Sequence, residues 1–415
     1  MDHEQALSKN IKSRRAVIGI VGIGYVGGAL ALGAAASGFK VIGVTRSDAR
    51  AIRVNEQKIP NYIATTDANN LIKCDIICIC VPTPIHEDKS PDLKPLQNAL
   101  AVTADYMQPG TLVIIESTIA PGTTRNIALP ILQASGLKEE EEFFLSFSPE
   151  RVDPGNKKYT IYNTPKVIAG LSNTSRDLTC KFFQSFVKKV VLVSSLEVAE
   201  MSKVLENTFR FINISFINEL VPYAKSLGVD MHEVINAAAT KPYGFLPHYP
   251  GPGVGGHCIP VDSCYLLSDA RKRGIPLTIV EDADRVNEEQ PKKVVTKTLE
   301  ILKKTNGHKT TYKVLLLGLS YKRDINDCRE SASLKIWKLL ENKKVAVSYH
   351  DPHIPSWNGQ ESQELTDETI LGSDVVIITT DHESVDYNKL AKYKKPILDT
   401  RKVFSNNGSP FVYEI

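Results

Sequence analysis

One glycine-spaced hexapeptide, directly after a short apolar run, limits what this chain of 415 residues can fold into. Residues 16–21 have the apolar character of a buried strand, and the small residues of 27–37 predict a helix that ends at Gly38. The first glycine of a G-x-G-x-x-G permits a tight turn, the second lets the backbone approach a pyrophosphate, and the third lets helix and strand pack closely. We therefore predict a dinucleotide site at this turn, with phosphates at the helix N-terminus. Its residues are Gly22, Ile23, Gly24, Tyr25, Val26 and Gly27.

The end of the next predicted strand, residues 40–44, bears on which dinucleotide is bound. An acidic residue usually stands there and binds the ribose hydroxyls. This chain has Thr45, Arg46 and Ser47 instead, and Asp48 comes so late that we expect it to cap the following helix. Without the carboxylate a 2′-phosphate is not repelled, and Arg46 with its neighbours could bind one. Alternatively, Arg46 only stacks on adenine, so NAD and NADP both stay open as cofactors.

Strand-like and helical segments alternate in two separate parts of the chain. A run of short apolar segments separated by helices is typical of a parallel sheet covered by helices. Between the two parts, a long helix is predicted from a capping box of Ser194 and Glu197 to Gly228. We therefore predict an α/β protein with two Rossmann-like doubly wound domains, 1–194 and 306–415, joined by a helical central domain, 195–305. Further strands are predicted at 76–81, 112–116, 143–147, 166–169, 190–193, 313–318, 345–349, 374–379 and 396–398, and a helix at 332–342.

Composition and charge argue against several classes of function. Fifty Lys and Arg against 47 Asp and Glu leave a net charge of +3, too small to indicate a nucleic acid or an anionic membrane as the main partner. No apolar run reaches the roughly 18 to 20 residues that span a bilayer, and residues 1–15 contain no signal-peptide core. We expect a cytoplasmic protein. The seven cysteines form no disulfide framework, and Cys74, Cys78 and Cys80 are expected in a buried strand rather than at a metal. No metal site is predicted.

A second glycine-rich stretch surrounds Cys258. Residues 251–262 read Gly-Pro-Gly-Val-Gly-Gly-His-Cys-Ile-Pro-Val-Asp, which disfavours regular helix or strand there. Such a loop presents a thiol, and nearby positive charge or N–H donors would favour its thiolate. On the long predicted helix, Lys203 and Asn207 are four residues apart and share a face, where they could stabilise an oxyanion. From spacing alone, Lys203 could equally be a solvated lysine paired with a neighbouring glutamate, at 200 or 206.

Seven motifs follow one another along nearly the whole chain. They are Gly22-Ile-Gly-Tyr-Val-Gly27; Val81-Pro-Thr-Pro84; Glu116-Ser-Thr118 with Pro121-Gly-Thr123; Ser148-Pro-Glu-Arg151; Glu200-Met-Ser-Lys203 with Glu206-Asn207; Gly253-Val-Gly-Gly-His-Cys258 with Asp262; and Ser320-Tyr-Lys322 with Asp327-Cys-Arg-Glu-Ser331. In this order they resemble the UDP-glucose/GDP-mannose dehydrogenase family and, within it, the UDP-sugar 6-dehydrogenases. The resemblance implies an NAD-binding N-terminal domain, a central domain used in dimerisation, and a C-terminal domain that binds the UDP-sugar. We accordingly expect a homodimer or a higher homo-oligomer.

The resemblance also implies roles for single residues. Cys258 matches the catalytic thiol, and its polar partners are Lys203, Asn207 and Asp262. Glu150 matches the acid of the hydrolytic step, and Thr118 a residue that places water and cofactor. The remaining matches near the cofactor are Thr83 and Arg329, and those near the substrate are Arg151, Tyr249, Gly255 and Lys322.

The expected reaction removes four electrons from one primary alcohol. Asp262, through a water held with Lys203, is our candidate base for the first oxidation. Cys258 then captures the aldehyde as a thiohemiacetal, which a second oxidation converts to a thioester. Water positioned by Glu150 and Thr118 hydrolyses that thioester.

Two stretches bear on the sugar. Residues 241–252 and 148–155 resemble the branch that oxidises UDP-N-acetylhexosamines. We favour UDP-N-acetylglucosamine, with UDP-glucose second and the galacto and manno epimers behind. The chain departs from the family at Ser263, where a proline commonly stands and where loop rigidity is in doubt, and at Cys264, which we expect to be packed.

Two other functions compete with this interpretation. A two-electron hydroxyacid dehydrogenase shares a similar N-terminal domain and helical centre, and a sensor would bind both ligands without turnover. The number of reduced cofactors formed per UDP-sugar separates the three: two, one or none.

Overall fold

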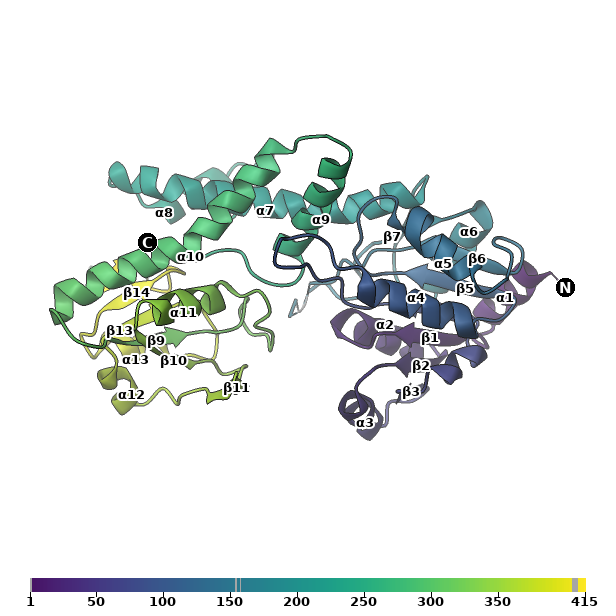
Figure 1. The fold of residues 1–415 in the computed structure, drawn as a ribbon, viewed down its shortest axis with the longest axis horizontal. Coiled ribbons are helices and arrows are strands. Elements are labelled where there is room, and N and C mark those ends of the chain that lie inside the picture. The colour runs from purple at the N-terminus through teal and green to yellow at the C-terminus, as the bar shows by residue number, and fades with distance from the viewer. Residues whose placement is uncertain (1, 154, 157, 405–409) are drawn as a thin grey trace. The chain divides into compact units, whose positions relative to one another are not determined.

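The computed structural model describes residues 2–153, 155, 156, 158–404 and 410–415, so Pro154 of the predicted substrate motif 148–155 lies outside the described residues. The chain divides into two compact units. The first consists of Met1–Glu206 with Cys264–Gly274, and the second of Asn207–Ser263 with Ile275–Ile415. Helix α7 (Leu196–Ser226) is the long central helix that the sequence predicts, and it contributes residues to both units (Figure 1).

The first unit is built on a sheet of eight strands in the order β3-β2-β1-β4-β5-β6-β7-β8. Neighbouring strands run parallel, except that β6 and β7 pair antiparallel. All residues of β4 and β5 are buried, as expected for strands covered on both faces. The strands are β1 (Val17–Val21), β2 (Lys40–Val44), β3 (Tyr62–Thr65), β4 (Ile76–Ile79), β5 (Thr111–Ile115), β6 (Phe143–Phe147), β7 (Lys166–Gly170) and β8 (Val190–Leu192).

Helices cover both faces of this sheet, which confirms the doubly wound arrangement. One core combines Ile18 and Ile20 of β1 with apolar residues of four helices, and the other combines Ile77 of β4 with the helical segments of the opposite face. The first set is α1 (His3–Lys12), α2 (Tyr25–Ala36), α3 (Asp48–Glu56) and α6 (Asn173–Phe183); the second is η1 (Ala68–Lys73), α4 (Lys94–Tyr106), η2 (Thr124–Ala128), α5 (Leu129–Gln133) and the start of α7.

The second unit contains a five-stranded parallel sheet in the order β10-β9-β13-β14-β15. Figure 1 shows helix α10 on one side of it and α12 on the other, and each side has its own apolar core. The second Rossmann-like domain is thereby confirmed. Its elements are β9 (Lys313–Leu317), α11 (Ala332–Asn342), β10 (Ala346–His350), β11 (Ser356–Trp357), β12 (Gln360–Glu361), α12 (Asp367–Gly372), β13 (Val375–Ile378), α13 (Tyr387–Ala391), β14 (Ile397–Asp399) and β15 (Val412–Glu414). The helical segment before it continues from α7 into α8 (Met231–Ala239), α9 (Ile259–Lys272) and α10 (Thr278–Asn306).

The start of α7 differs from the prediction by one residue. The hydroxyl of Ser195, rather than that of Ser194, accepts the Val198 N–H at 3.3 Å. Glu197 does not close a capping box on Ser194, because its carboxylate pairs with Arg125 at 2.8 Å. Two adjacent serines are equivalent by spacing, and only the backbone turn decides which hydroxyl lies under the first N–H groups.

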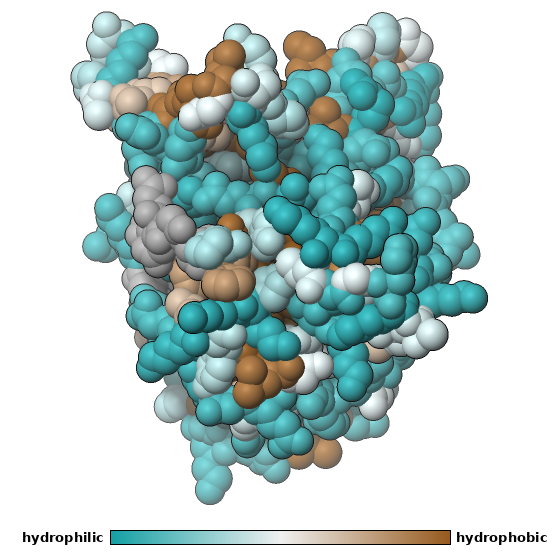
Figure 2. All heavy atoms as spheres, turned by 90° about the vertical axis from the view of Figure 1, so that its left-hand side faces the viewer, coloured by the Kyte–Doolittle hydropathy of each residue, from teal (hydrophilic) through white to brown (hydrophobic). Residues whose placement is uncertain are grey.

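Figure 2 shows a mostly hydrophilic face of the second unit, with apolar side chains gathered toward its upper rim. Exposed apolar residues of this unit include Phe216 and Tyr223 on α7, Leu227 directly after it and Val234 on α8. Among the helices of the described residues, none combines the length and apolar character needed to cross a membrane.

Candidate active site

The predicted dinucleotide turn joins β1 to α2. Gly22 has a φ of 92°, and a Cβ there would lie 2.6 Å from the Cys80 carbonyl oxygen. A Cβ on Gly27 would lie 2.1 Å from the Gly22 oxygen, so helix and strand approach more closely than any side chain allows. Gly24 caps α2 without a side-chain hydrogen bond, and a Cβ there would meet nothing nearer than Arg50 at 3.9 Å. The backbone at the start of α2 is therefore uncrowded, as the approach of a pyrophosphate to its first N–H groups requires.

The residues after β2 form the adenosine end of this turn. Ser47 caps α3, so the expectation that Asp48 does so is wrong: Asp48 is the first residue of the helix and Ser47 precedes it. Arg46 is exposed, as an arginine available to adenine or to a 2′-phosphate must be. A second cation was missed: the Arg50 guanidinium donates to the Ile23 carbonyl at 3.0 Å. A basic residue one turn into the helix after the second strand was the signal for it.

Thr83 and Thr118 follow strands β4 and β5. These strands and β1 are neighbours in the parallel sheet, so both threonines lie at the same edge as the dinucleotide turn. Thr83 is buried and Thr118 is half-buried. Their contacts with cofactor and water stay a prediction.

Glu150 belongs to a buried charge cluster that sequence analysis missed. The Lys166 Nζ atom lies 2.7 Å from Glu116 Oε2 and 3.0 Å from Glu150 Oε2, and all three side chains are less than 9% exposed. Burial raises the pKa of Glu116 to about 7. Burial acts in the same direction on Glu150, but Lys166 and two backbone N–H groups outweigh it and lower the pKa. Glu150 is therefore held as a carboxylate. A lysine at the start of a buried strand was the signal for this cluster.

Both glutamates that could have paired with Lys203 have other partners. Glu200 is fully buried and accepts two backbone N–H groups from the loop after β5. Glu206 forms an ion pair with Arg151 at 2.6 Å. Arg151 also donates to a backbone carbonyl at 2.8 Å, so this predicted substrate residue is anchored within the first unit. Lys203 is half-buried, and neither glutamate is left to pair with it. The interpretation of Lys203 as a surface lysine paired with a neighbouring glutamate is therefore disfavoured.

Cys258 is exposed, whereas the other six cysteines are buried or half-buried. The carbonyl of Cys258 accepts the first helical hydrogen bond of α9, from the Asp262 N–H at 2.9 Å. The thiol thus stands at the N-terminus of a 14-residue helix. Electrostatic attraction also links Cys258 to Arg329, whose pKa is raised first by its hydrogen bonds to Asp327 and in smaller part by Cys258. Helix dipole and guanidinium both favour the thiolate.

The expectation that no regular helix occurs around Cys258 is wrong, because α9 begins at the next residue. The helix tolerates Pro260 in its first turn, where a backbone N–H would have no partner within the helix. Ser263, at which a flexible loop was in question, is buried within α9 and donates its hydroxyl to the Ile259 carbonyl at 3.1 Å. Cys264 is buried, as expected.

Two of the predicted polar partners of the thiol meet in the second unit. The buried Asp262 accepts a hydrogen bond from the Asn207 side-chain amide. That bond restricts the rotamers of both side chains and holds the Asn207 amide against the Asp262 carboxylate.

Two buried asparagines hold the glycine loop before Cys258. Asn218 of α7 accepts the Gly251 N–H at 2.9 Å. Asn287 of α10 accepts the Val254 N–H at 2.7 Å and donates to the Val254 carbonyl at 3.3 Å. Each asparagine is 3% exposed. Sequence analysis missed both, although an asparagine at an apolar position of a helix is the usual sign of such a clamp.

The last part of this loop packs against the segment after β9. A Cβ on Gly255 would lie 2.6 Å from the Glu330 carbonyl oxygen, and Gly256, with a φ of 89°, lies against the ring of Tyr321. The glycines are therefore required by packing. Contact of Gly255 and of the adjacent, half-buried Lys322 with substrate stays a prediction.

Tyr249 is directed toward α8. Its hydroxyl donates to Asn236 at 2.8 Å, and its ring stacks on His232 with 5.6 Å between centroids. Its predicted role near the substrate is not tested by these contacts.

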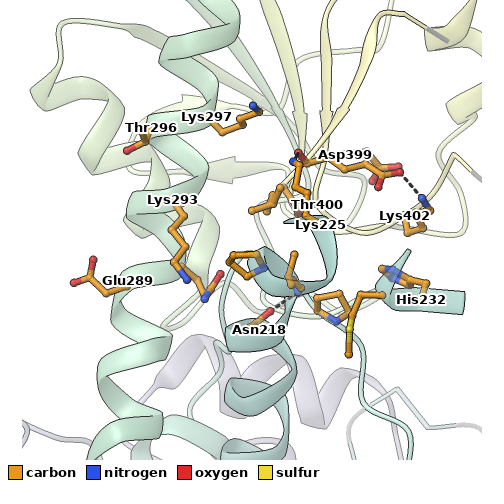
Figure 3. A pocket seen from close by; sticks show the side chains of 18 of the residues that line it. Asn218, Lys225, His232, Glu289, Lys293, Thr296, Lys297, Asp399, Thr400 and Lys402 are labelled. Atoms are coloured by element: carbon orange, nitrogen blue, oxygen red, sulfur yellow. Dashed lines mark hydrogen bonds and ion pairs between the residues drawn. The ribbon is translucent and has the colours of Figure 1, made fainter. Parts of the chain in front are cut away.

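A cavity of about 450 Å³ lies in the second unit between α7, the start of α8, α10 and the end of β14 (Figure 3). Lys225, Lys293 and Lys297 contribute ammonium groups to its lining. Burial and the nearby Lys297 lower the pKa of Lys225. Asn218 also lines it, and its Nδ2 has no hydrogen-bond partner in the part of the chain that the structure describes. The carboxylates of Asp230, Glu289, Glu300, Asp399 and Glu414 also line the cavity, so its wall carries charges of both signs.

The second sheet repeats the topology of the first without its dinucleotide site. Asp351, directly after β10, stands where a ribose-binding acid would be. It is 1% exposed, and its carboxylate accepts the N–H groups of Leu319 at 2.7 Å and Ser320 at 2.9 Å. The carboxylate is therefore engaged within the protein and does not reach a bound ribose.

Glu116→Gln tests the buried charge cluster. The pKa of Glu116 is about 7 in the folded protein against an ordinary 4.5, so the folded state binds more protons than the unfolded state between these values. Wild type should therefore lose stability relative to the variant as pH rises from about 5 to about 7, by roughly 2 to 3 kcal/mol at most. Urea unfolding at three pH values measures this. A difference between the proteins that stays constant with pH contradicts the assignment, and the exposed Glu341→Gln is the control.

The chain matches known proteins over nearly its whole length. Three domains of the UDP-glucose/GDP-mannose dehydrogenase family match in order: the NAD binding domain at residues 60–187, the central domain at 197–289 and the UDP binding domain at 315–406. The UDP-N-acetyl-D-mannosamine dehydrogenase of Pyrococcus horikoshii is 33% identical over 95% of this chain and 98% of that protein. The UDP-N-acetyl-D-glucosamine 6-dehydrogenase of Pseudomonas aeruginosa is 35% identical over 73% of this chain and 72% of that protein.

Solved structures agree with the sequence comparisons. The structure of UDP-D-ManNAc dehydrogenase from Pyrococcus horikoshii superposes with a TM-score of 0.88 at 32% identity and covers 96% of this chain and 99% of that one. The NAD binding match covers β3 to β7 of the first sheet, and the UDP binding match covers most of β9 and the strands β10, β13 and β14 of the second. The chain therefore belongs to the UDP-glucose/GDP-mannose dehydrogenase family and is a nucleotide-sugar dehydrogenase.

Proposed function

We propose that this protein oxidises the C6 alcohol of a UDP-N-acetylhexosamine to a carboxylate in two successive oxidations, with Cys258 as the nucleophile. The observation that carries the proposal is the exposed thiol at the start of α9, attracted by Arg329. A dehydrogenase that stops after two electrons needs no such thiol. NAD, when bound, accepts one hydride in each oxidation.

Asp262 is the base that we assign to the first oxidation. Its carboxylate is buried and positioned by Asn207, and we assign it the C6 hydroxyl proton, taken directly or through a water. The Cys258 thiolate then adds to the aldehyde carbon, and the carbonyl electrons move to oxygen. Lys203 and Asn207 are the donors for the resulting alkoxide.

Glu150 serves the hydrolytic half of the reaction. The second oxidation leaves a thioester on Cys258, which water attacks with departure of the thiolate. A base must take the proton of that water, and Lys166 holds Glu150 in the ionised form that can do so. Thr118 and Arg151 are the residues that we expect to help position water and substrate.

The sugar is the finer part of the proposal. Sequence motifs alone favour UDP-N-acetylglucosamine, whereas a relative that matches along nearly the whole chain is named for UDP-N-acetyl-D-mannosamine. Both epimers are therefore first candidates, and UDP-glucose follows. We place the nucleotide half in the second unit, supported by the match of residues 315–406 to the UDP binding domain of the family and by the cavity at the carboxyl end of this unit's sheet.

Cys258→Ala should lower uronate formation by roughly a thousandfold or more, because capture of the aldehyde requires the thiolate. Wild type should form two reduced cofactors per UDP-sugar, measured by absorbance and by product mass with both N-acetylhexosamine epimers and UDP-glucose. The matched control is Cys180→Ala, which removes a half-buried thiol that has no part in the proposed reaction. This variant should keep its activity. One reduced cofactor per sugar would indicate a hydroxyacid-type dehydrogenase, and none a sensor.

Arg46→Asp should change the cofactor preference. NAD is the cofactor that the family match supports, while the missing acid leaves Arg46 free to bind the 2′-phosphate of NADP. Restoring a carboxylate repels that phosphate, so kcat/KM with NADP should fall at least about tenfold relative to NAD. The nearby exposed Arg53→Asp is the control. A wild type without NADP activity, or an unchanged ratio, rules out the phosphate role.

We also propose that α7 mediates a homodimer. Phe209, Phe216 and Tyr223 recur every seven residues on it and are 49%, 54% and 65% exposed, a stripe that suits helix–helix packing. Phe216→Glu should give monomers by light scattering at micromolar concentration. Leu371→Glu on α12, a similarly exposed apolar site, should leave the mass unchanged. A dimeric Phe216→Glu variant contradicts the assignment of this interface.

A further inference from the structure

Three side chains of metal-binding type converge at one edge of the second sheet. Asp324, His353 and His382 come from the segments after β9, β10 and β13, whose carboxyl ends are adjacent. Asp324 Oδ1 lies 3.6 Å from His353 Nε2 and 3.6 Å from His382 Nδ1. All three donor atoms lie within 4.8 Å of one another. None of the three residues has a part in the proposed reaction, so the cluster requires its own explanation.

His382 has the surroundings of an oriented metal ligand. Its side chain is fully buried, and its Nε2 lies 3.1 Å from a carboxylate oxygen of Asp351 and 3.0 Å from the Ser320 hydroxyl. The Asp324 backbone N–H donates to Nδ1 at 3.0 Å, so Nδ1 carries the lone pair and Nε2 the proton. A carboxylate on the far nitrogen is the usual companion of a metal-bound histidine, because it fixes the tautomer and raises the basicity of the ligand nitrogen.

His353 supplies an unexplained nitrogen to the same place. Its Nε2 is buried and has no hydrogen-bond partner among the described residues, although polar atoms at such depth are normally satisfied. The ring lies 4.9 Å from the ring of His382, measured between centroids. About a third of the His353 side chain is exposed, so this ring can move toward the cluster without disturbing a core.

We propose that Asp324, His353 and His382 bind one divalent transition-metal ion of the zinc type. A tetrahedral zinc ion about 2.0 to 2.1 Å from each donor places the donors roughly 3.3 to 3.4 Å apart. The two distances to Asp324 already approach that value, and only His353 and His382 must close further. Two imidazoles with one carboxylate suit zinc and its neighbours, whereas magnesium and calcium prefer all-oxygen sites.

Binding exchanges one hydrogen bond for a metal bond. The Nδ1 lone pair of His382 now accepts the Asp324 N–H, so that amide must turn away when Nδ1 binds the ion. Three protein ligands leave a fourth position for water. The site involves no thiol, which separates it from Cys258, and its existence does not depend on the proposed reaction.

Cobalt titration of the full chain tests the proposal. After treatment with a chelator, the protein is titrated with Co²⁺ and the visible spectrum is recorded, followed by competition with Zn²⁺. Wild type should bind one ion with the ligand-field bands of nitrogen and oxygen donors. His353→Ala and Asp324→Asn should each weaken binding at least about a hundredfold. Hydrogen exchange of the segment around Asp324 should change on metal addition in wild type but not in these two variants.

Matched controls separate this site from other metal-binding groups. His350→Ala removes a half-buried histidine three residues from His353 and should bind Co²⁺ like wild type, as should Cys258→Ala. Thermal unfolding without metal checks that each variant is folded. Unchanged affinity in a folded His353→Ala variant, a spectrum dominated by thiolate-to-cobalt charge transfer, or no binding by wild type would each overturn the proposal.

Discussion

Parallel pairing of strands brings the residues that follow each strand to one edge of a sheet, and both units depend on that constraint. In the first unit it gathers the glycine turn after β1 with Thr83 and Thr118, although about a hundred residues of chain separate the first from the last. In the second unit it gathers Asp351 with the histidines at 353 and 382. The same topology thus yields a dinucleotide turn in one sheet and a closed polar network in the other.

Buried charges hold these edges in place. Taking an ion out of water is costly unless an opposite charge or several N–H groups replace the solvent. Lys166 and two backbone N–H groups satisfy this condition for Glu150, whose pKa is lowered, whereas burial outweighs the same lysine at Glu116 and the backbone N–H groups at Glu200 and raises the pKa of both. A glutamate that is fixed and kept ionised in this way can accept a proton from water without first having to reorganise, which is what the hydrolytic half of the proposed reaction requires.

The thiol acquires its surroundings from local and distant parts of the second unit. The glycines and prolines before Cys258 predict a loop that presents the side chain, and the cysteine is indeed exposed. The prediction that no regular helix occurs at residues 251–262 was wrong, because α9 begins directly after Cys258 and accommodates Pro260 in its first turn. The buried asparagines of α7 and α10 that hold the loop lie dozens of residues away, and no local pattern connects them to it.

The sequence by itself determined the order of the elements, the two α/β domains, the dinucleotide turn and the identity of the exposed cysteine, because apolar periodicity and glycine spacing act over a few residues. Even there, the choice between Ser194 and Ser195, or between Ser47 and Asp48, needed the backbone turn. Tertiary structure alone decided which charges meet: Lys166 with two glutamates, Arg151 with Glu206, and a carboxylate with two histidines. Such contacts join segments far apart in the chain. Their electrostatic attraction becomes strong only when the folded sheets have brought those segments together and excluded the water between them.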